Sequence, residues 1–326
     1  MAKMVNTVTG LIEADKLGKT LMHEHFVFGY PGYAGDATFG SFDRDKALEV
    51  GITVAERAKS HGVNTIVDAT PNDSGRNPIL LKEISEKTGI NIICATGYYY
   101  EGEGAPAYFK FRSLMGDAEK EIYEMMLKEV TEGIGNTGIK AGVIKLASSK
   151  DIITDYETMF FKAAAKVQRE TGVVIITHTQ AGTMGAEQAD LLISEGADPS
   201  KIVIGHMCGN TDIQYQVNVL EKGVYIGFDR FGLQGLGGSP KDIYREALTV
   251  ALLALGYEDR ILFAHDTVNF LLGRPLVFPP QLAETMVDAH IGRIFEVIIP
   301  DLKRMGVTDE QIGKIMSNNP KNIFHN

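Results

Sequence analysis

The chain has 326 residues, of which 23% are charged and 44% hydrophobic, values that are ordinary for a globular protein. Its formal net charge of −10 argues against a nucleic-acid or anionic-membrane partner, because such surfaces need a basic patch. No N-terminal segment joins a basic stretch to a long apolar core, and no run approaches about 20 apolar residues. Both cysteines, Cys94 and Cys208, lie in apolar runs, which predicts buried free thiols in a cytoplasmic protein.

Eight short apolar segments are predicted to be β-strands. Several are nearly continuous in Val, Ile and Ala, which is typical of parallel strands covered on both faces. In chain order the segments are 20–28, 63–70, 90–98, 139–148, 173–179, 201–207, 223–230 and 260–267.

Helical patterns separate these strands. Segments 43–62 and 155–172 have apolar residues at i, i+3 and i+4, acidic starts and a glycine at the expected C-cap. The last residues of the chain predict a terminal helix with Thr308 as its N-cap.

This alternation predicts an α/β protein, a (β/α)8 TIM barrel, with residues 1–326 forming a single domain. An open doubly wound sheet is the alternative. However, no glycine-rich phosphate loop follows the first strand, and no Pro- or Ser-rich linker divides the chain.

Polar residues stand out at the ends of the predicted strands, where catalytic groups of such barrels project. Each alone has a simpler structural explanation, but together they indicate a site. They are His23 and His25 on the first strand, Lys145 on the fourth, His178 on the fifth, His206 on the sixth, and His265 and Asp266 on the eighth. His265 and Asp266 are adjacent and must point to opposite sides, as must Lys140 and Lys145, so only one member of each pair can enter the site.

Imidazole and carboxylate ligands suit zinc and similar divalent metals. A catalytic zinc needs about three protein ligands, and this set is larger, so two metals are expected. Two close cations need a bridging anion. A buried lysine of lowered pKa can react with CO2 to form a carbamate, so Lys145 could supply that bridge beside a shared hydroxide.

The same residues resemble those of the phosphotriesterase-like lactonases in the binuclear-metal amidohydrolase superfamily. The similarity extends over essentially the whole chain. It is carried by LMHEHFVFGYPG (21–32), ATGYYYEGEGAP (95–106), AGVIKLASS (141–149), THTQAGTMG (177–185), IGHMCGNTD (204–212) and FDRFGLQG (228–235). Lysine at the end of the fourth strand separates this family from relatives that share only the HxH motif.

The resemblance implies two divalent metals (Zn, Co, Fe or Mn) per chain and a homodimer. One metal would be held by His23, His25 and Asp266 and the other by His178 and His206, with N6-carboxylated Lys145 and hydroxide between them. It further implies hydrolysis of lactones, including N-acyl-homoserine lactones and other γ- and δ-lactones (quorum quenching), with promiscuous phosphotriesterase activity.

Further roles follow from the same resemblance. Asp266 would move the proton, Tyr99 would contact the lactone ring, and Arg230 would lie at the site edge. Some members of the family place a tryptophan in the loop that lines the acyl-chain pocket. This chain has no tryptophan, so Phe270, Leu271 and Leu272 are expected to line that pocket. Glu24 should face away from the metals. The alternatives are a primary phosphotriesterase (aryldialkylphosphatase), a cyclic-amide hydrolase on the same site, and a non-catalytic metal-binding protein.

Overall fold

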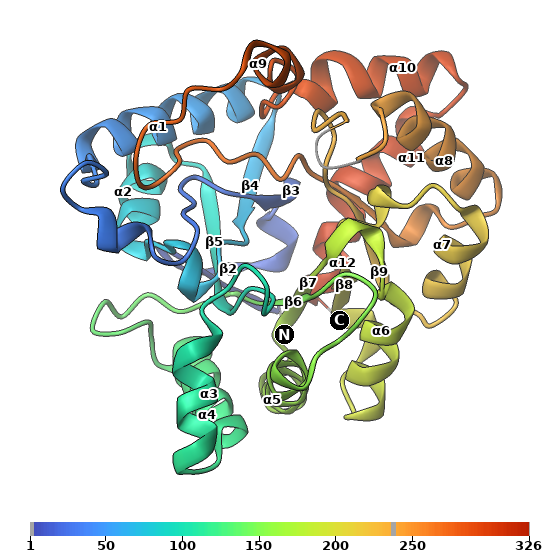
Figure 1. Ribbon diagram of the computed structural model, residues 1–326. Coiled ribbons are helices and arrows are strands. Elements are labelled where there is room, and N and C mark those ends of the chain that lie inside the picture. The colour runs from blue at the N-terminus through green and yellow to red at the C-terminus, as the bar shows by residue number, and fades with distance from the viewer. Residues whose placement is uncertain (1–2, 236–238, 326) are drawn as a thin grey trace.

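The computed structural model describes residues 3–235 and 239–325, and its strands form two sheets (Figure 1). A small antiparallel hairpin is made by β1 (Met4–Thr7) and β2 (Gly10–Glu13). The large sheet is parallel, and its strands follow one another in sequence order. They are β3 (Lys19–Glu24), β4 (Val63–Asp68), β5 (Asn91–Gly97), β6 (Val143–Ser148), β7 (Val174–Thr179), β8 (Ile202–Ile204), β9 (Tyr225–Phe228) and β10 (Ile261–Phe263).

The first and last strands of the large sheet meet, so the sheet closes into a barrel. Beyond β10, the Asp266 amide donates to the His23 carbonyl, and the His25 amide donates to the Thr267 carbonyl, both at 3.0 Å. Helices surround the strands, as in a (β/α)8 barrel (Figure 1). The predicted TIM barrel is therefore confirmed, and the open sheet is excluded.

Consecutive strands of the barrel are connected by α1 (Arg44–Ser60), α2 (Pro78–Thr88), α3 (Pro106–Met115), α4 (Ala118–Thr131), α5 (Asp155–Thr171), α6 (Gly185–Ser194), α7 (Ile213–Leu220) and α8 (Asp242–Ala254). Four further helices follow β10: α9 (Pro280–Met286), α10 (Ile299–Arg304), α11 (Asp309–Gly313) and α12 (Asn319–His325). The two predicted helices begin and end as expected. Asp43 caps α1, and α5 ends at Gly172, which has a φ of 71° that glycine adopts without steric cost.

Thr308 caps the terminal helical run, as predicted, through a capping box with Gln311. The run is not one regular helix, however. A π-helical segment over Lys314–Asn318 separates α11 from α12.

Several strands end earlier than their apolar runs predict, and this moves functional residues into loops. The last residues of β3, β8 and β10 are Glu24, Ile204 and Phe263, so His25, His206 and Asp266 lie beyond them. His206 and Asp266 have φ values of 57° and 55°, a left-handed backbone that cannot continue a strand.

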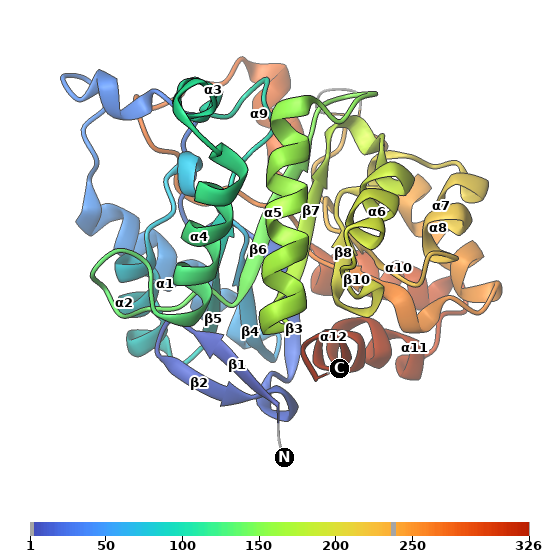
Figure 2. The same ribbon diagram turned by 90° about the horizontal axis from the view of Figure 1, so that it is seen from below.

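The apolar core has two parts, one between the sheet and the helices and one inside the barrel. The inner part runs from strand residues such as Met22, Val67 and Ile176 to Val5 of β1 and Phe324 of α12. The hairpin and α12 lie together at one end of the barrel and close that end (Figure 2). Sequence patterns did not predict the hairpin.

Both cysteines are buried and free, as expected. Within 3–235 and 239–325, no helix is both long enough and apolar enough to cross a membrane.

Candidate functional site

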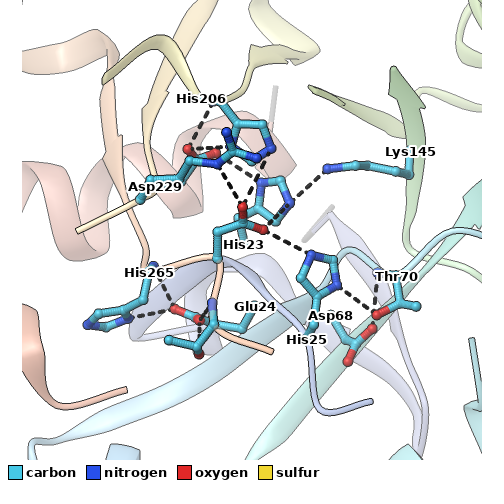
Figure 3. A network of polar contacts seen from close by, with 12 residues as sticks. His23, Glu24, His25, Asp68, Thr70, Lys145, His206, Asp229 and His265 are labelled. Atoms are coloured by element: carbon cyan, nitrogen blue, oxygen red, sulfur yellow. Dashed lines mark hydrogen bonds and ion pairs between the residues drawn. The ribbon is translucent and has the colours of Figure 1, made fainter. Parts of the chain in front are cut away.

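His23 and His25 project from the same side of β3 and its continuation, with ring centroids 5.4 Å apart. Both side chains are buried. Glu24, between them, points to the opposite side and contacts His265 (Figure 3). This is the period-2 alternation predicted for the segment.

Buried acceptors fix which nitrogen of each imidazole carries the proton. One oxygen of the Asp229 carboxylate accepts a hydrogen bond from Nδ1 of His23, and the other accepts one from Nδ1 of His206, both at 2.9 Å (Figure 3). Nδ1 of His25 lies 2.8 Å from the Thr70 hydroxyl, whose own hydrogen is directed to the Val27 carbonyl. All three Nδ1 atoms therefore donate, and the Nε2 atoms retain their lone pairs.

The three Nε2 atoms surround the Asp266 carboxylate. His25, His23 and His206 approach its oxygens at 3.0, 3.5 and 3.8 Å. Imidazole nitrogens and carboxylate oxygens that converge in this way are the ligand atoms typical of a divalent metal site. His23, His206 and Asp266 each offer one ligand atom, and these atoms lie within 4.8 Å of one another. The donor set therefore fits a divalent metal.

Burial also gives these groups the protonation states of metal ligands. Removal from water lowers the pKa of His23 and lowers the pKa values of His178 and His206 well below 6.5, so the three rings are neutral at pH 7. Burial alone would raise the pKa of Asp266, but its interactions with His206 and with the Arg230 guanidinium hold that pKa well below 3.8. Asp266 is therefore ionised.

Of the two lysines Lys140 and Lys145, it is Lys145 whose side chain enters the site. Its side chain is 1% exposed, and Nζ donates to Nε2 of His23 at 2.7 Å. Burial lowers the pKa of Lys145 to about 8. A neutral amine is thus accessible near physiological pH, which is the form that reacts with CO2. Lys140 precedes β6 and is only half-buried.

His178, at the end of β7, lies on the other side of the cluster. Its Nε2 is 2.7 Å from Oε1 of Gln180, which leaves Nδ1 as the atom available to a metal. Its ring is 4.6 Å from His206 and 4.9 Å from Tyr99, centroid to centroid. Tyr99 and His178 are therefore neighbours in one site, as predicted.

A cavity of about 630 Å³ opens above these groups. Its floor contains Lys145, His178, His206, Asp266 and Arg230, and Nε of Arg230 donates to Oδ2 of Asp266 at 2.9 Å. The wall and mouth are largely apolar and include Phe28, Leu233, Leu271, Leu276, Phe278, Leu282 and Met286. The volume lies within the range of small-molecule sites.

Only one of the three residues predicted to line the acyl-chain pocket does so. Leu271 lines the cavity, whereas Phe270 packs against Phe42, and Leu272 is buried beside Gly29 and Gly75. The Phe28 amide donates to the Phe270 carbonyl and the Leu272 amide to the Phe28 carbonyl, so this stretch is paired like a strand. Alternate side chains of a strand face opposite sides, which places Leu271 inside and its neighbours outside.

Asp229 is the functional residue that sequence reasoning missed. Its signal in the sequence is a carboxylate at the end of the strand predicted over 223–230, directly before Arg230. Asp229 is 2% exposed and orients two histidines, so it completes the site without entering the cavity.

The fold and the site define a barrel hydrolase with its reactive groups at the carboxyl ends of the strands. The family model described as "Phosphotriesterase family" matches residues 3–324, and the chain belongs to that family.

Its relatives include lactonases and a phosphatase. A PTE-like lactonase from Deinococcus radiodurans, solved as a mutant, is 55% identical with a TM-score of 0.97, and the match covers 98% of this chain and 99% of that one. An aryldialkylphosphatase from Saccharolobus solfataricus is 36% identical over 96% of each chain. A phospho-furanose lactonase from Mycoplasmopsis synoviae is 30% identical over 99% of this chain and 92% of its own.

Proposed function

We propose that this hydrolase opens lactones, including N-acyl-homoserine lactones and other γ- and δ-lactones, and hydrolyses organophosphate triesters as a secondary activity. The observation that carries the proposal is the convergence of three imidazole Nε2 atoms on the Asp266 carboxylate at the floor of a predominantly apolar cavity. The family relationship to lactonases supports it.

Two divalent metals fit the donor set. His23, His25 and Asp266 would hold one ion, His178 and His206 the other, and carboxylated Lys145 would lie between them. When bound, such ions polarise a carbonyl and lower the pKa of water to about 7. The ligand chemistry accepts Zn, Co, Fe or Mn.

The shape and polarity of the cavity favour a neutral amphiphilic ester. A lactone ring is small and polar, so it suits the floor, while an acyl chain suits the apolar wall that leads to the mouth. Leu271, Leu233 and Phe278 would contact that chain.

Three side chains of the floor have defined roles in this reaction. Asp266 is ionised, so it can accept a proton from water and return it to the ring oxygen as the C–O bond breaks. Burial raises the pKa of Tyr99 well above 10, so its hydroxyl stays protonated and can donate to the lactone. Arg230 flanks Asp266 and would orient the substrate from the edge of the site.

Kinetics on a substrate panel test the proposal. Protein loaded with a defined metal is assayed on a homoserine lactone, a simple alkyl lactone and paraoxon. We expect kcat/KM for the better lactone to exceed that for paraoxon by at least about 100-fold, which is roughly 2.7 kcal/mol in transition-state binding. Elemental analysis should find two metals per chain after loading with bicarbonate.

The alternatives make different predictions in the same assay. A primary phosphotriesterase would prefer paraoxon, and a cyclic-amide hydrolase would hydrolyse a dihydropyrimidine while leaving lactones intact. A non-catalytic metal protein would bind metal and hydrolyse none of these substrates. Any of the three results would contradict the proposal.

The homodimer, the cytoplasmic location and the single domain over residues 1–326 remain predictions. Sedimentation equilibrium of the metal-loaded protein tests the first, with a mass of two chains expected and a mass of 35.6 kDa contradicting it.

A further inference from the structure

The Glu24 carboxylate is bonded to both neighbours of Asp266. Oε1 accepts from the backbone amide of His265 at 2.9 Å and from Nδ1 of the same residue at 2.6 Å. Oε2 accepts from the Thr267 amide at 3.2 Å and from its hydroxyl at 2.8 Å. These four hydrogen bonds form the Glu24 bridge, which lies on the side of β3 opposite the metal-binding groups (Figure 3).

The bridge spans a left-handed residue. Asp266 has a φ of 55°, a left-handed conformation that is uncommon for residues with a side chain, although Asp adopts it more readily than most. Its amide is bonded to the His23 carbonyl, which fixes the spacing to β3. The Glu24 bridge adds an anchor on each side of the left-handed residue and so restricts rotation of the backbone that carries the carboxylate.

The bridge is also rigid. The Glu24 side chain is 1% exposed, and hydrogen bonds to a buried carboxylate are charge-assisted and short. His265 is held at its other end, because Nε2 accepts from the Ile294 amide at 3.1 Å. His265 therefore cannot follow Asp266 if the segment turns.

A second left-handed residue of the site has a comparable anchor. His206 has a φ of 57°, and one oxygen of Asp229 accepts both its backbone amide and its Nδ1 at 2.9 Å. A buried carboxylate therefore bonds backbone amides at both positions: Glu24 bonds those on either side of Asp266, and Asp229 bonds that of His206 itself.

We propose that Glu24 is a positioning residue for the reaction: the Glu24 bridge holds Asp266 in its left-handed conformation and thereby sets the carboxylate among the three Nε2 atoms. The inference rests on the proposed function: its kinetic consequence depends on the proposed reaction, and the rate of metal release depends on the proposed metal site. Removing the bridge loosens the Asp266 carboxylate and its metal, without touching the cavity that binds substrate.

Glu24→Gln tests the proposal, because the amide keeps the volume but places donor hydrogens where the bridge needs an acceptor. We expect metal release to a chelator to accelerate by about 10- to 100-fold, with an altered d–d spectrum of the cobalt-loaded protein. We expect kcat to fall by a similar factor, while KM for the lactone changes by less than about twofold.

Gln168→Leu is the matched control. Gln168 is a buried polar residue near the carboxyl end of α5, bonded to the backbone of Asp198 at the opposite end of the barrel. We expect this variant to lose thermal stability but to keep kcat and the rate of metal release. If Glu24→Gln behaves in the same way as Gln168→Leu, Glu24 is only a structural residue and the proposal is overturned.

Thr267→Val provides a milder second variant should Glu24→Gln fail to fold. It removes one hydroxyl donor from the bridge and keeps the backbone amide bond. Faster metal release than in Gln168→Leu supports the proposal, and an unchanged rate overturns it. Metal release requires no substrate, so it remains decisive even if lactones prove not to be the substrates.

Discussion

The floor and the mouth of the cavity are built differently. The floor groups lie at strand ends or directly after them, are buried, and have partners such as Asp229 and Thr70 that restrict their orientation. The mouth is formed largely by a loop and α9 with exposed apolar side chains; Leu276 is 57% and Phe278 41% exposed. The barrel therefore determines the chemistry, while the loops determine which substrate reaches it. Changes at the floor should lower kcat, and changes at the mouth should alter substrate preference.

The largest effect is expected for Asp266→Asn. The amide cannot accept the proton during attack, so we expect kcat for the lactone to fall by about 1,000-fold, the middle of the range for a lost acid–base group. Metal content measured on the same preparation separates proton transfer from metal loss. Full activity with two metals bound would contradict the role of Asp266.

Asp229→Asn is expected to lower the affinity for metal, which is a smaller effect than the loss of kcat in Asp266→Asn. An amide can accept from only one of the two Nδ1 atoms, so either His23 or His206 loses its orientation. We expect metal affinity to fall by about 10- to 100-fold, measured by competition with a chelator. An affinity equal to that of the unaltered protein would show that the two histidines are oriented by other contacts.

The pKa of Lys145 makes reconstitution depend on pH. Only the neutral amine reacts with CO2, and burial lowers the pKa of Lys145 to about 8. The neutral fraction therefore falls as pH drops below 8, by about tenfold for each pH unit. At constant dissolved CO2, metal-free protein should regain activity faster as pH rises from about 6.5 to 8 and level off above that value. Lys145→Arg should never recover, and a rate that does not vary with pH would contradict carbamate formation at Lys145.

Sequence patterns predicted most of the floor and little of the mouth. His23, His25 and His178 are polar residues at the ends of apolar strands, so local contrast reveals them. The same contrast left open whether Lys140 or Lys145, and whether His265 or Asp266, enters the site, and only the resemblance to the phosphotriesterase-like lactonases indicated Lys145 and Asp266. Asp229 has the same contrast, but its role depends on which histidines lie across the barrel, a long-range fact.

Two further features were not predicted from the sequence, namely the orientation of Phe270 and Leu272 and the β1–β2 hairpin. The direction of Phe270 and Leu272 depends on pairing with Phe28, a residue more than 240 positions away. The β1–β2 hairpin has two strands of only four residues each, too short for a period-2 pattern to stand out. The direction of the loop side chains is thus determined by contacts between residues distant in sequence, which local patterns do not reveal.

The smallest predicted effect concerns the cavity wall, where the Leu271 side chain lines the cavity and the Leu272 side chain packs behind it. Leu271→Ala removes apolar surface from the cavity wall, so KM for a long-chain acyl-homoserine lactone should rise by about three- to tenfold, while KM for a short lactone stays constant. Leu272→Ala is the matched control, because this side chain packs behind the wall beside Gly29 and Gly75. It should lower the melting temperature and leave the ratio of the two KM values unchanged. If Leu272→Ala shifts that ratio as much as Leu271→Ala does, chain preference depends on the stiffness of the whole loop rather than on contacts with the acyl chain.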